Sequence, residues 1–227
     1  RGILFLPYLA GSGSPDYDSN AQAALLGLTL AHGSADVARA ILEGESRTGV
    51  TTMLMDPGLD SGPVFLAEET EIGEEDTART LHDRLARMGA RLLLLTLEGM
   101  EKNTLLPRPQ DPSRATLAPK IEKEEARIVW SAPAGRIFNQ IRAFDPWPGA
   151  YTFWRGRTLK LFRPRLMNGE PRETPGTVTG ASAEGIRLAV PGGFLLIREV
   201  QMENRPRMAA ADFLRGNALS PGTRLGE

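Results

Sequence analysis

One long amphipathic stretch in the first half of this 227-residue chain most constrains its fold. Its apolar side chains recur every three or four residues, which is the spacing of one face of an α-helix: Leu81, Leu85, Met88, Leu92 and Leu95. The pattern predicts a helix over residues 76–99. Full burial of these five side chains would contribute roughly 7–15 kcal/mol, at about 1.5–3 kcal/mol each. Such a helix needs a sheet to pack against, which favours an α/β fold.

The residues in front of this helix are typical of two β-strands. Val50–Met55 is rich in strand-forming residues, Asp56-Pro57-Gly58 interrupts the run, and Pro63–Ala67 resumes it. A shorter helix is expected over residues 36–43. The first half of the chain therefore supplies a few strands and helices of an α/β unit.

The second half shows a different pattern after a proline-rich segment. Residues 101–120 hold Pro107, Pro109, Pro112 and Pro119, which predicts an extended linker over residues 106–120. Short helices are expected at residues 132–144 and 209–215. Five short β-rich runs lie between them, and their spacing predicts a small closed barrel: residues 151–154, 158–166, 176–179, 186–190 and 194–200.

Composition limits the classes of function. The chain has no cysteine and two histidines, which excludes disulfides and thiolate metal sites and suits a reducing cytosol. No apolar run approaches the ~20 residues that span a bilayer, and no charged-then-apolar signal segment is found. We therefore expect a soluble, cytoplasmic protein with no metal site and no membrane partner.

A net charge of −1 conceals two halves of opposite sign. Residues 114–227 contain 18 Lys and Arg against 11 Asp and Glu, whereas residues 1–113 contain 9 against 17. Such asymmetry indicates either that the C-terminal half faces a polyanion or that it carries ordinary solvated charge. Both interpretations remain open at this point.

Two runs around the second half resemble the methionyl-tRNA formyltransferase family: Leu117–Trp130 (LAPKIEKEEARIVW) and Ile141–Gly149 (IRAFDPWPG). The likeness extends from about residue 38 to residue 227 and includes Ala211–Gly216. It implies an α/β remnant of a Rossmann-like formyltransferase domain, with residues 45–105 as its C-terminal part. A small OB-like β-barrel that binds tRNA would follow over residues 121–227.

The loop between the two predicted strands, Met55–Val64, looks like the one that bears the catalytic aspartate of folate-dependent formyltransferases. By this resemblance Asp60 is the catalytic carboxylate. It would orient a histidine and help move protons as the formyl group passes from 10-formyltetrahydrofolate to the amino group of initiator methionyl-tRNA. Gly58 and Gly62 would let the backbone approach the pterin ring closely. Taken without the resemblance, Asp60 is a turn residue.

The family's upstream Asn-x-His-Gly-Ser-Leu-Leu-Pro segment has no good counterpart here. His32 has Leu30 where the asparagine is expected, and it lies 28 positions before Asp60 instead of roughly 36. At the family's spacing, the position of the histidine falls near Ala24. We therefore expect the chain to be catalytically impaired.

The N-terminal residues 1–44 resemble a different family, the sugar kinases of the xylulokinase type. The resemblance rests on Leu4–Gly11, Gly27–Gly33 and Ala38–Gly44. It implies a fusion with its seam at residues 38–44. The catalytic aspartate and ATP-binding glycines of those kinases are missing, so kinase activity is not expected.

The formyltransferase resemblance also implies an RNA-binding surface. Between Asp145 and Glu170 lie five cations and no acid, and such a stripe would follow phosphates by charge. If residues 158–166 form a strand, Leu159 and Leu161 face inward and Lys160 faces out. Trp130 and Trp147 are expected in the core or at a domain seam. The residues implied in tRNA binding are Lys120, Lys123, Arg155, Arg157, Lys160 and Arg163.

Three hypotheses about function follow. The first is a formyltransferase by lineage, impaired in this chain, monomeric, and using 10-formyltetrahydrofolate as a co-substrate rather than a bound cofactor. The second is an RNA-binding module without catalysis. The third is a sugar-kinase remnant.

Overall fold

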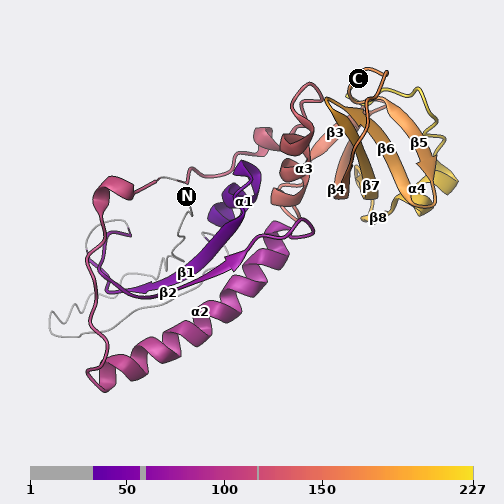
Figure 1. Cartoon of the computed structure of the whole chain (residues 1–227). Helices are drawn as coiled ribbons and strands as arrows, with labels where there is room; N and C mark the ends of the chain where they lie inside the picture. Colours follow the sequence, from indigo (N-terminus) through magenta and orange to yellow (C-terminus); the bar gives the residue numbers. More distant parts are fainter. Residues whose placement is uncertain (1–32, 57–59, 117, 227) are drawn as a thin grey trace. The chain divides into compact units, whose positions relative to one another are not determined.

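The computed structural model describes residues 33–56, 60–116 and 118–226, in two compact units (Figure 1). Of the described residues, the first unit comprises 33–40, 45–74 and 79–120. The second comprises residues 41–44, 75–78 and 121–227. Over the described residues no helix is both long and apolar enough to cross a membrane.

The first unit is built on an antiparallel strand pair, β1 (Arg47–Met53) and β2 (Val64–Glu71). The two strands predicted within residues 48–72 are thus confirmed. Their register runs from Arg47 opposite Glu71 to Thr52 opposite Leu66, and it shifts between Thr52 and Met53. Figure 1 shows α2 (Ala78–Glu101) lying alongside this strand pair.

Helix α2 confirms the helix predicted over residues 76–99, but its buried face differs from the predicted one. Leu81, Leu85 and Leu92 are buried, whereas Leu95 is 50% exposed and was wrongly assigned to the core. Thr96 is buried in its place. Its hydroxyl donates to the Leu92 carbonyl at 2.8 Å and lies 2.8 Å from the Thr52 hydroxyl of β1. A buried hydrogen bond, rather than an apolar contact of Leu95, therefore joins this part of the helix to β1.

Helix α1 (Gly33–Glu43) includes the helix predicted over residues 36–43. Its apolar residues from Val37 to Leu42 are buried. Residues 38–44, where the sequence places a fusion seam, are largely one continuous helix that ends at Glu43. The kinase-like residues 1–32, with Ala24 and His32, lie outside the described residues.

The second unit contains a six-stranded antiparallel sheet, and each of the five predicted β-rich runs corresponds to a strand. The order is β3-β4-β7-β6-β5, with β8 paired to β7. The strands are β3 (Tyr151–Trp154), β4 (Arg157–Met167), β5 (Val178–Ser182), β6 (Gly185–Val190), β7 (Gly193–Met202) and β8 (Met208–Ala209). The predicted helices are present as α3 (Ala134–Ala143) and α4 (Ala210–Gly216).

The core of the second unit lies against this sheet. The inward orientation predicted for Leu159 and Leu161 is confirmed, because both are almost fully buried. Further fully buried side chains come from β6, β7 and the two helices: Ile186, Leu188, Leu195, Ile197, Ile137, Ile141 and Phe213. Phe144, which follows α3, and Val178 of β5 are also fully buried. Alternation along the strands delivers these side chains to one apolar layer.

The predicted closed, OB-like barrel is not confirmed, since among the described strands β3 and β5 remain edges of the path and do not pair with each other. The C-terminal segment instead hydrogen-bonds near both edges. Val178 N donates to Thr223 O at 2.8 Å, and Gly226 N donates to Phe153 O at 2.8 Å. This segment therefore satisfies backbone groups that open sheet edges leave unpaired.

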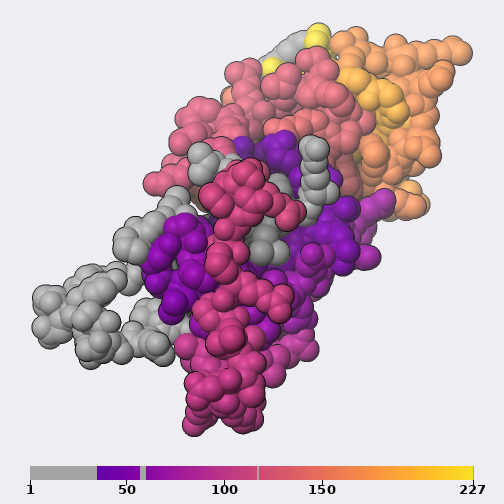
Figure 2. All heavy atoms as spheres, turned by 60° about the vertical axis from the view of Figure 1, so that its left-hand side comes forward, coloured from indigo at the N-terminus to yellow at the C-terminus, as the bar shows by residue number. Residues whose placement is uncertain are grey.

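The proline-rich segment is extended, as predicted, and it is also fixed to the first unit. Val64 and Arg108 exchange two backbone hydrogen bonds of 2.8 Å. Farther along, the Arg39 guanidinium donates to the carbonyls of Pro119 at 3.0 Å and Lys120 at 2.8 Å. Figure 2 shows this segment, in rose, along the face turned toward the viewer.

Candidate active-site loop and basic surface

Asp60 lies in the loop that joins β1 to β2, between Leu54 and Pro63. Its φ angle is +53°, in the left-handed region that aspartate adopts more readily than most side chains. Gly58, predicted to approach the pterin, lies outside the described residues. The loop therefore presents Asp60 in a backbone conformation that its neighbours must stabilise.

The Asp60 carboxyl group is the perturbed acid of this loop. Its Oδ1 atom is buried and has no hydrogen-bond partner among the described residues. Burial raises the pKa of Asp60 above its ordinary value, because a desolvated carboxylate is less stable than the neutral acid. A carboxyl with a raised pKa is better matched to proton transfer near neutral pH.

Gly62 has a structural reason to be glycine. A Cβ atom there would lie 1.8 Å from the carbonyl oxygen of Leu54. The loop can close only if residue 62 has no side chain. Close approach of Gly62 to a pterin ring stays a prediction.

Two polar residues that the sequence did not single out hold this loop. The Ser61 hydroxyl lies 2.9 and 3.0 Å from the two carboxylate oxygens of Asp56. The Gln110 side-chain nitrogen donates to the carbonyls of Asp60 at 2.8 Å and Gly62 at 2.7 Å. Gln110 lies 50 positions from Asp60, so no local pattern could have indicated it.

The cations predicted to contact RNA are engaged in different ways, and Lys120 and Lys123 are exposed. Arg155 stacks over the Trp154 ring with its guanidinium carbon 4.7 Å from the centroid. Arg157 donates to the Glu203 carbonyl at 3.1 Å. Lys160, predicted to face out, is half-buried, and its Nζ donates to the Pro148 carbonyl at 2.8 Å. Its ammonium is thus used within the fold.

Arg163 is about half exposed and belongs to an ion-pair network of the second unit. It pairs with Glu199 at 3.2 Å, and Glu199 also accepts from Arg207 at 2.6 Å. Arg207 in turn binds both carboxylate oxygens of Asp145, at 2.8 and 3.1 Å. Burial opposes the charged forms, but these hydrogen bonds outweigh it, so the pKa of Glu199 is lowered and that of Arg207 is raised.

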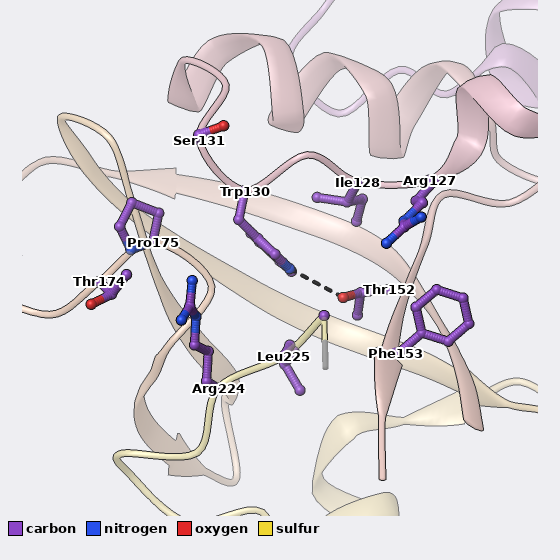
Figure 3. A pocket seen from close by; sticks show the side chains of 11 residues that line it. Arg127, Ile128, Trp130, Ser131, Thr152, Phe153, Thr174, Pro175, Arg224 and Leu225 are labelled. Atoms are coloured by element: carbon purple, nitrogen blue, oxygen red, sulfur yellow. Dashed lines mark hydrogen bonds between the residues drawn. The ribbon is translucent and has the colours of Figure 1, made fainter. Parts of the chain in front are cut away.

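A cavity of about 290 Å³ opens in the second unit where the C-terminal segment meets β3 (Figure 3). Arg127 and Arg224 line it, and the Arg127 guanidinium lies over the Phe153 ring at 5.5 Å. Guanidinium groups beside aromatic rings are the chemistry that contacts phosphates and bases. Trp130 forms part of the wall, and its indole nitrogen donates to the Thr152 hydroxyl at 3.1 Å.

The two tryptophans singled out in the sequence differ in burial. Trp130 is buried, as predicted. Trp147 is 57% exposed, so it does not lie in the core, and the alternative position at a domain seam stays a prediction. Within the described residues, no cluster of three or more His, Asp or Glu could hold a metal ion.

Models of two protein families match the chain. The family described as "Formyl transferase" matches residues 24–97, and "Formyl transferase, C-terminal domain" matches residues 120–218. The first match includes residues 24–44, so it overlaps the segment set apart as kinase-like. The sugar-kinase resemblance of residues 1–44 is not supported.

Curated relatives are methionyl-tRNA formyltransferases. The chain is 44% identical to that of Solibacter usitatus over 195 residues, which are 86% of this chain and 62% of the relative. It is 42% identical to that of Geobacter sulfurreducens over 195 residues, 86% of this chain and 61% of the relative. The chain thus spans just over three fifths of the length of these relatives.

Solved structures share the fold at low identity. HypX from Aquifex aeolicus in complex with tetrahydrofolic acid has a TM-score of 0.63 at 22% identity, covering 78% of this chain and 32% of that one. A methionyl-tRNA formyltransferase from Clostridium thermocellum has a TM-score of 0.52 at 16% identity, covering 74% of this chain and 61% of that one.

Proposed function

The chain belongs to the formyltransferase family, and on that premise we propose that it transfers a formyl group from 10-formyltetrahydrofolate to the amino group of initiator methionyl-tRNA. Identity of 42–44% to methionyl-tRNA formyltransferases, over 195 residues, supports this substrate pair. The folate is a co-substrate in this proposal, since it is consumed in each turnover.

Asp60 is the catalytic carboxylate in the proposed reaction. Attack of the amine on the formyl carbon builds negative charge on the formyl oxygen and releases a proton from the nitrogen. Burial raises the pKa of Asp60, which makes its carboxylate a stronger base for that proton than an exposed aspartate. Gly58 and Gly62 would flank the pterin. The observation that carries the proposal is the buried Asp60 Oδ1 without a partner among the described residues.

A formylation assay with charged initiator tRNA tests this role. Asp60→Asn keeps the shape of the side chain but cannot take up the proton, so we expect kcat to fall by about 10²–10⁴-fold. Asp83→Asn, a change at an exposed carboxylate of α2, is the matched control. An equal loss in the two variants, or no turnover by the unchanged chain, would contradict the proposed function.

The impairment expected from the residues around His32 stays a prediction, and the same assay addresses it. Without an Asn and His pair beside the carboxylate, oxyanion stabilisation is incomplete, and the chain should turn over slowly. Turnover within about tenfold of an intact methionyl-tRNA formyltransferase, a difference of about 1.4 kcal/mol in the barrier, would contradict impairment.

We propose the second unit and the segment leading into it as the tRNA-binding surface, with Lys120, Lys123, Arg155 and Arg157 as phosphate contacts and with Lys160 and Arg163 in fold-stabilising pairs beside them. When a protein binds through phosphate contacts, the logarithm of its binding constant falls linearly with log[salt]. The slope is roughly −0.9 for each phosphate contact on duplex nucleic acid. Arg155→Gln should lower that slope by about 1. Arg215→Gln, on an exposed arginine paired with Asp212, should not. Affinity independent of ionic strength would refute this surface.

The two alternatives gain no support from the comparisons. An RNA-binding module without catalysis would bind tRNA in the salt titration and show no turnover at any enzyme concentration. A sugar-kinase remnant would bind ATP or xylulose in calorimetry. A monomeric state and a cytoplasmic location stay predictions.

A further inference from the structure

We propose that Gln110 is a positioning residue that holds the Asp60 loop in its working conformation. This inference rests on the proposed role of Asp60. Gln110 belongs to the segment predicted as a linker, so the segment has a second task besides joining the two units.

The contact is a clamp across one residue. The Gln110 Nε2 atom lies 2.8 Å from the Asp60 carbonyl oxygen and 2.7 Å from that of Gly62. A carboxamide nitrogen carries two hydrogens, and each carbonyl receives one. The reverse orientation would place the amide oxygen against two carbonyl oxygens, so only one arrangement of the side chain fits.

We infer that the loop needs this contact because, among the described residues, its own hydrogen bonds do not fix the Asp60 backbone. Asp60 is in the left-handed region, which a side chain rarely adopts without support. Ser61 bonds only to Asp56 of the same loop, and Gly62 is packed against Leu54. Among the described contacts of residues 60–62, the Gln110 clamp is the one that reaches into another part of the chain.

Gln110 is itself held on both sides. Two residues before it, Arg108 exchanges a pair of 2.8 Å backbone hydrogen bonds with Val64 of β2. One residue after it, Asp111 accepts from the backbone nitrogen of Ser113 at 3.0 Å and from its hydroxyl at 2.7 Å. The donor is therefore presented from fixed backbone, which is what a positioning contact requires.

Three variants of the full chain test the proposal. Gln110→Met keeps the length of the side chain and removes both donors. Gln110→Glu offers no donor when ionised and one when protonated. Gln140→Met is the matched control, because Gln140 makes the same kind of clamp in the second unit, on the carbonyls of Glu125 at 2.6 Å and Arg127 at 3.1 Å.

Backbone amide hydrogen exchange measures how firmly the clamp holds the loop, and it needs no assay of activity. We expect exchange of the hydrogen-bonded amides beside the clamp, those of Leu54 and Val64, to accelerate about tenfold in Gln110→Met, as the loss of one or two net hydrogen bonds implies. Gln110→Glu should show the same acceleration at neutral pH and recover part of the way toward the unchanged chain, compared at the same pH, below about pH 4, where the carboxyl is protonated and carries one donor. Gln140→Met should leave these amides unchanged. Unaltered exchange in both Gln110 variants would overturn the clamp.

Kinetics separate a positioning role from a merely structural one. With the loop displaced, kcat for formylation should fall about 10- to 100-fold while KM for tRNA stays the same. A loosened loop with unchanged kcat would overturn the positioning role and leave the proposed function standing. A loosened loop in a chain that never formylates tRNA would overturn the proposed function and not the clamp.

Discussion

The two units are stabilised by different means. The second unit has six antiparallel strands and a continuous layer of fully buried aliphatic side chains, among them Leu159, Leu188 and Leu195. The first unit has one described strand pair, and α2 leaves Leu94 and Leu95 half or more exposed. Its loop and its proline-rich segment are held by individual hydrogen bonds.

The difference shows where each unit can be perturbed. In an apolar core, truncation of one buried side chain removes its burial free energy and leaves a cavity, so it destabilises the whole unit by several kcal/mol. A hydrogen-bonded loop depends on a few groups, and the loss of one moves the loop without unfolding the unit. The proposed catalytic residue, Asp60, lies in the first unit, in the loop that is held by individual hydrogen bonds.

The largest expected effect comes from the core of the second unit. Leu195→Ala removes a fully buried side chain from the central strand β7 and should lower the free energy of unfolding by about 3 kcal/mol. The same change at Leu95, which is 50% exposed, should cost less than about 1 kcal/mol. Urea unfolding measures both. Equal losses would contradict the buried face that we describe for α2.

Arg207→Met should cost about 2 kcal/mol at neutral pH, because it leaves the buried Asp145 carboxylate without its bidentate partner while Arg207 is partly exposed. The pKa of Glu199 is lowered in the fold, so this stabilisation is present above the ordinary glutamate pKa and is lost as pH falls through the folded value. The loss in the variant should therefore shrink in acid. Arg215→Met, at an exposed ion pair, is the control.

Gly89→Ala should stabilise the first unit by about 0.5–1 kcal/mol, since alanine is the better helix former. The added Cβ would lie 4.0 Å from a methyl carbon of Val50, an ordinary contact. Gly99→Ala, in the same helix, would place a Cβ 2.9 Å from that of Leu105 and should destabilise. Opposite shifts of the thermal unfolding midpoint in the two variants would support this packing. A lower midpoint for Gly89→Ala would refute it.

The smallest expected stability effect is that of Asp60→Asn. The pKa of Asp60 is raised by burial, so the native state binds its proton more tightly than the unfolded chain does. Its contribution to stability is fully present below the ordinary aspartate pKa and declines as pH rises through the raised value. The variant should therefore gain stability relative to the unchanged chain as pH rises above the ordinary aspartate pKa of about 4. A constant difference above that pH would contradict the shift.

Sequence patterns predicted helices and strands well where the apolar residues recur with one regular spacing. Five of the six described strands of the second unit and all four described α-helices correspond to predicted runs, whereas β8 was not predicted. The exchange of Leu95 for Thr96 could not be predicted, because a hydroxyl pair across 44 positions decided it. For the same reason the engagement of Lys160 by Pro148 and the clamp by Gln110 left no local signal.

The sequence by itself determined the resemblance to formyltransferases, the two-part organisation and the position of Asp60 in a loop between two strands, because motifs and apolar periods are local properties of the chain. The tertiary structure decided which face of α2 is buried, how the C-terminal segment joins the sheet edges, and what holds the loop around Asp60. Those outcomes depend on polar atoms that meet only after folding, and their hydrogen bonds leave no periodic trace in the order of residues.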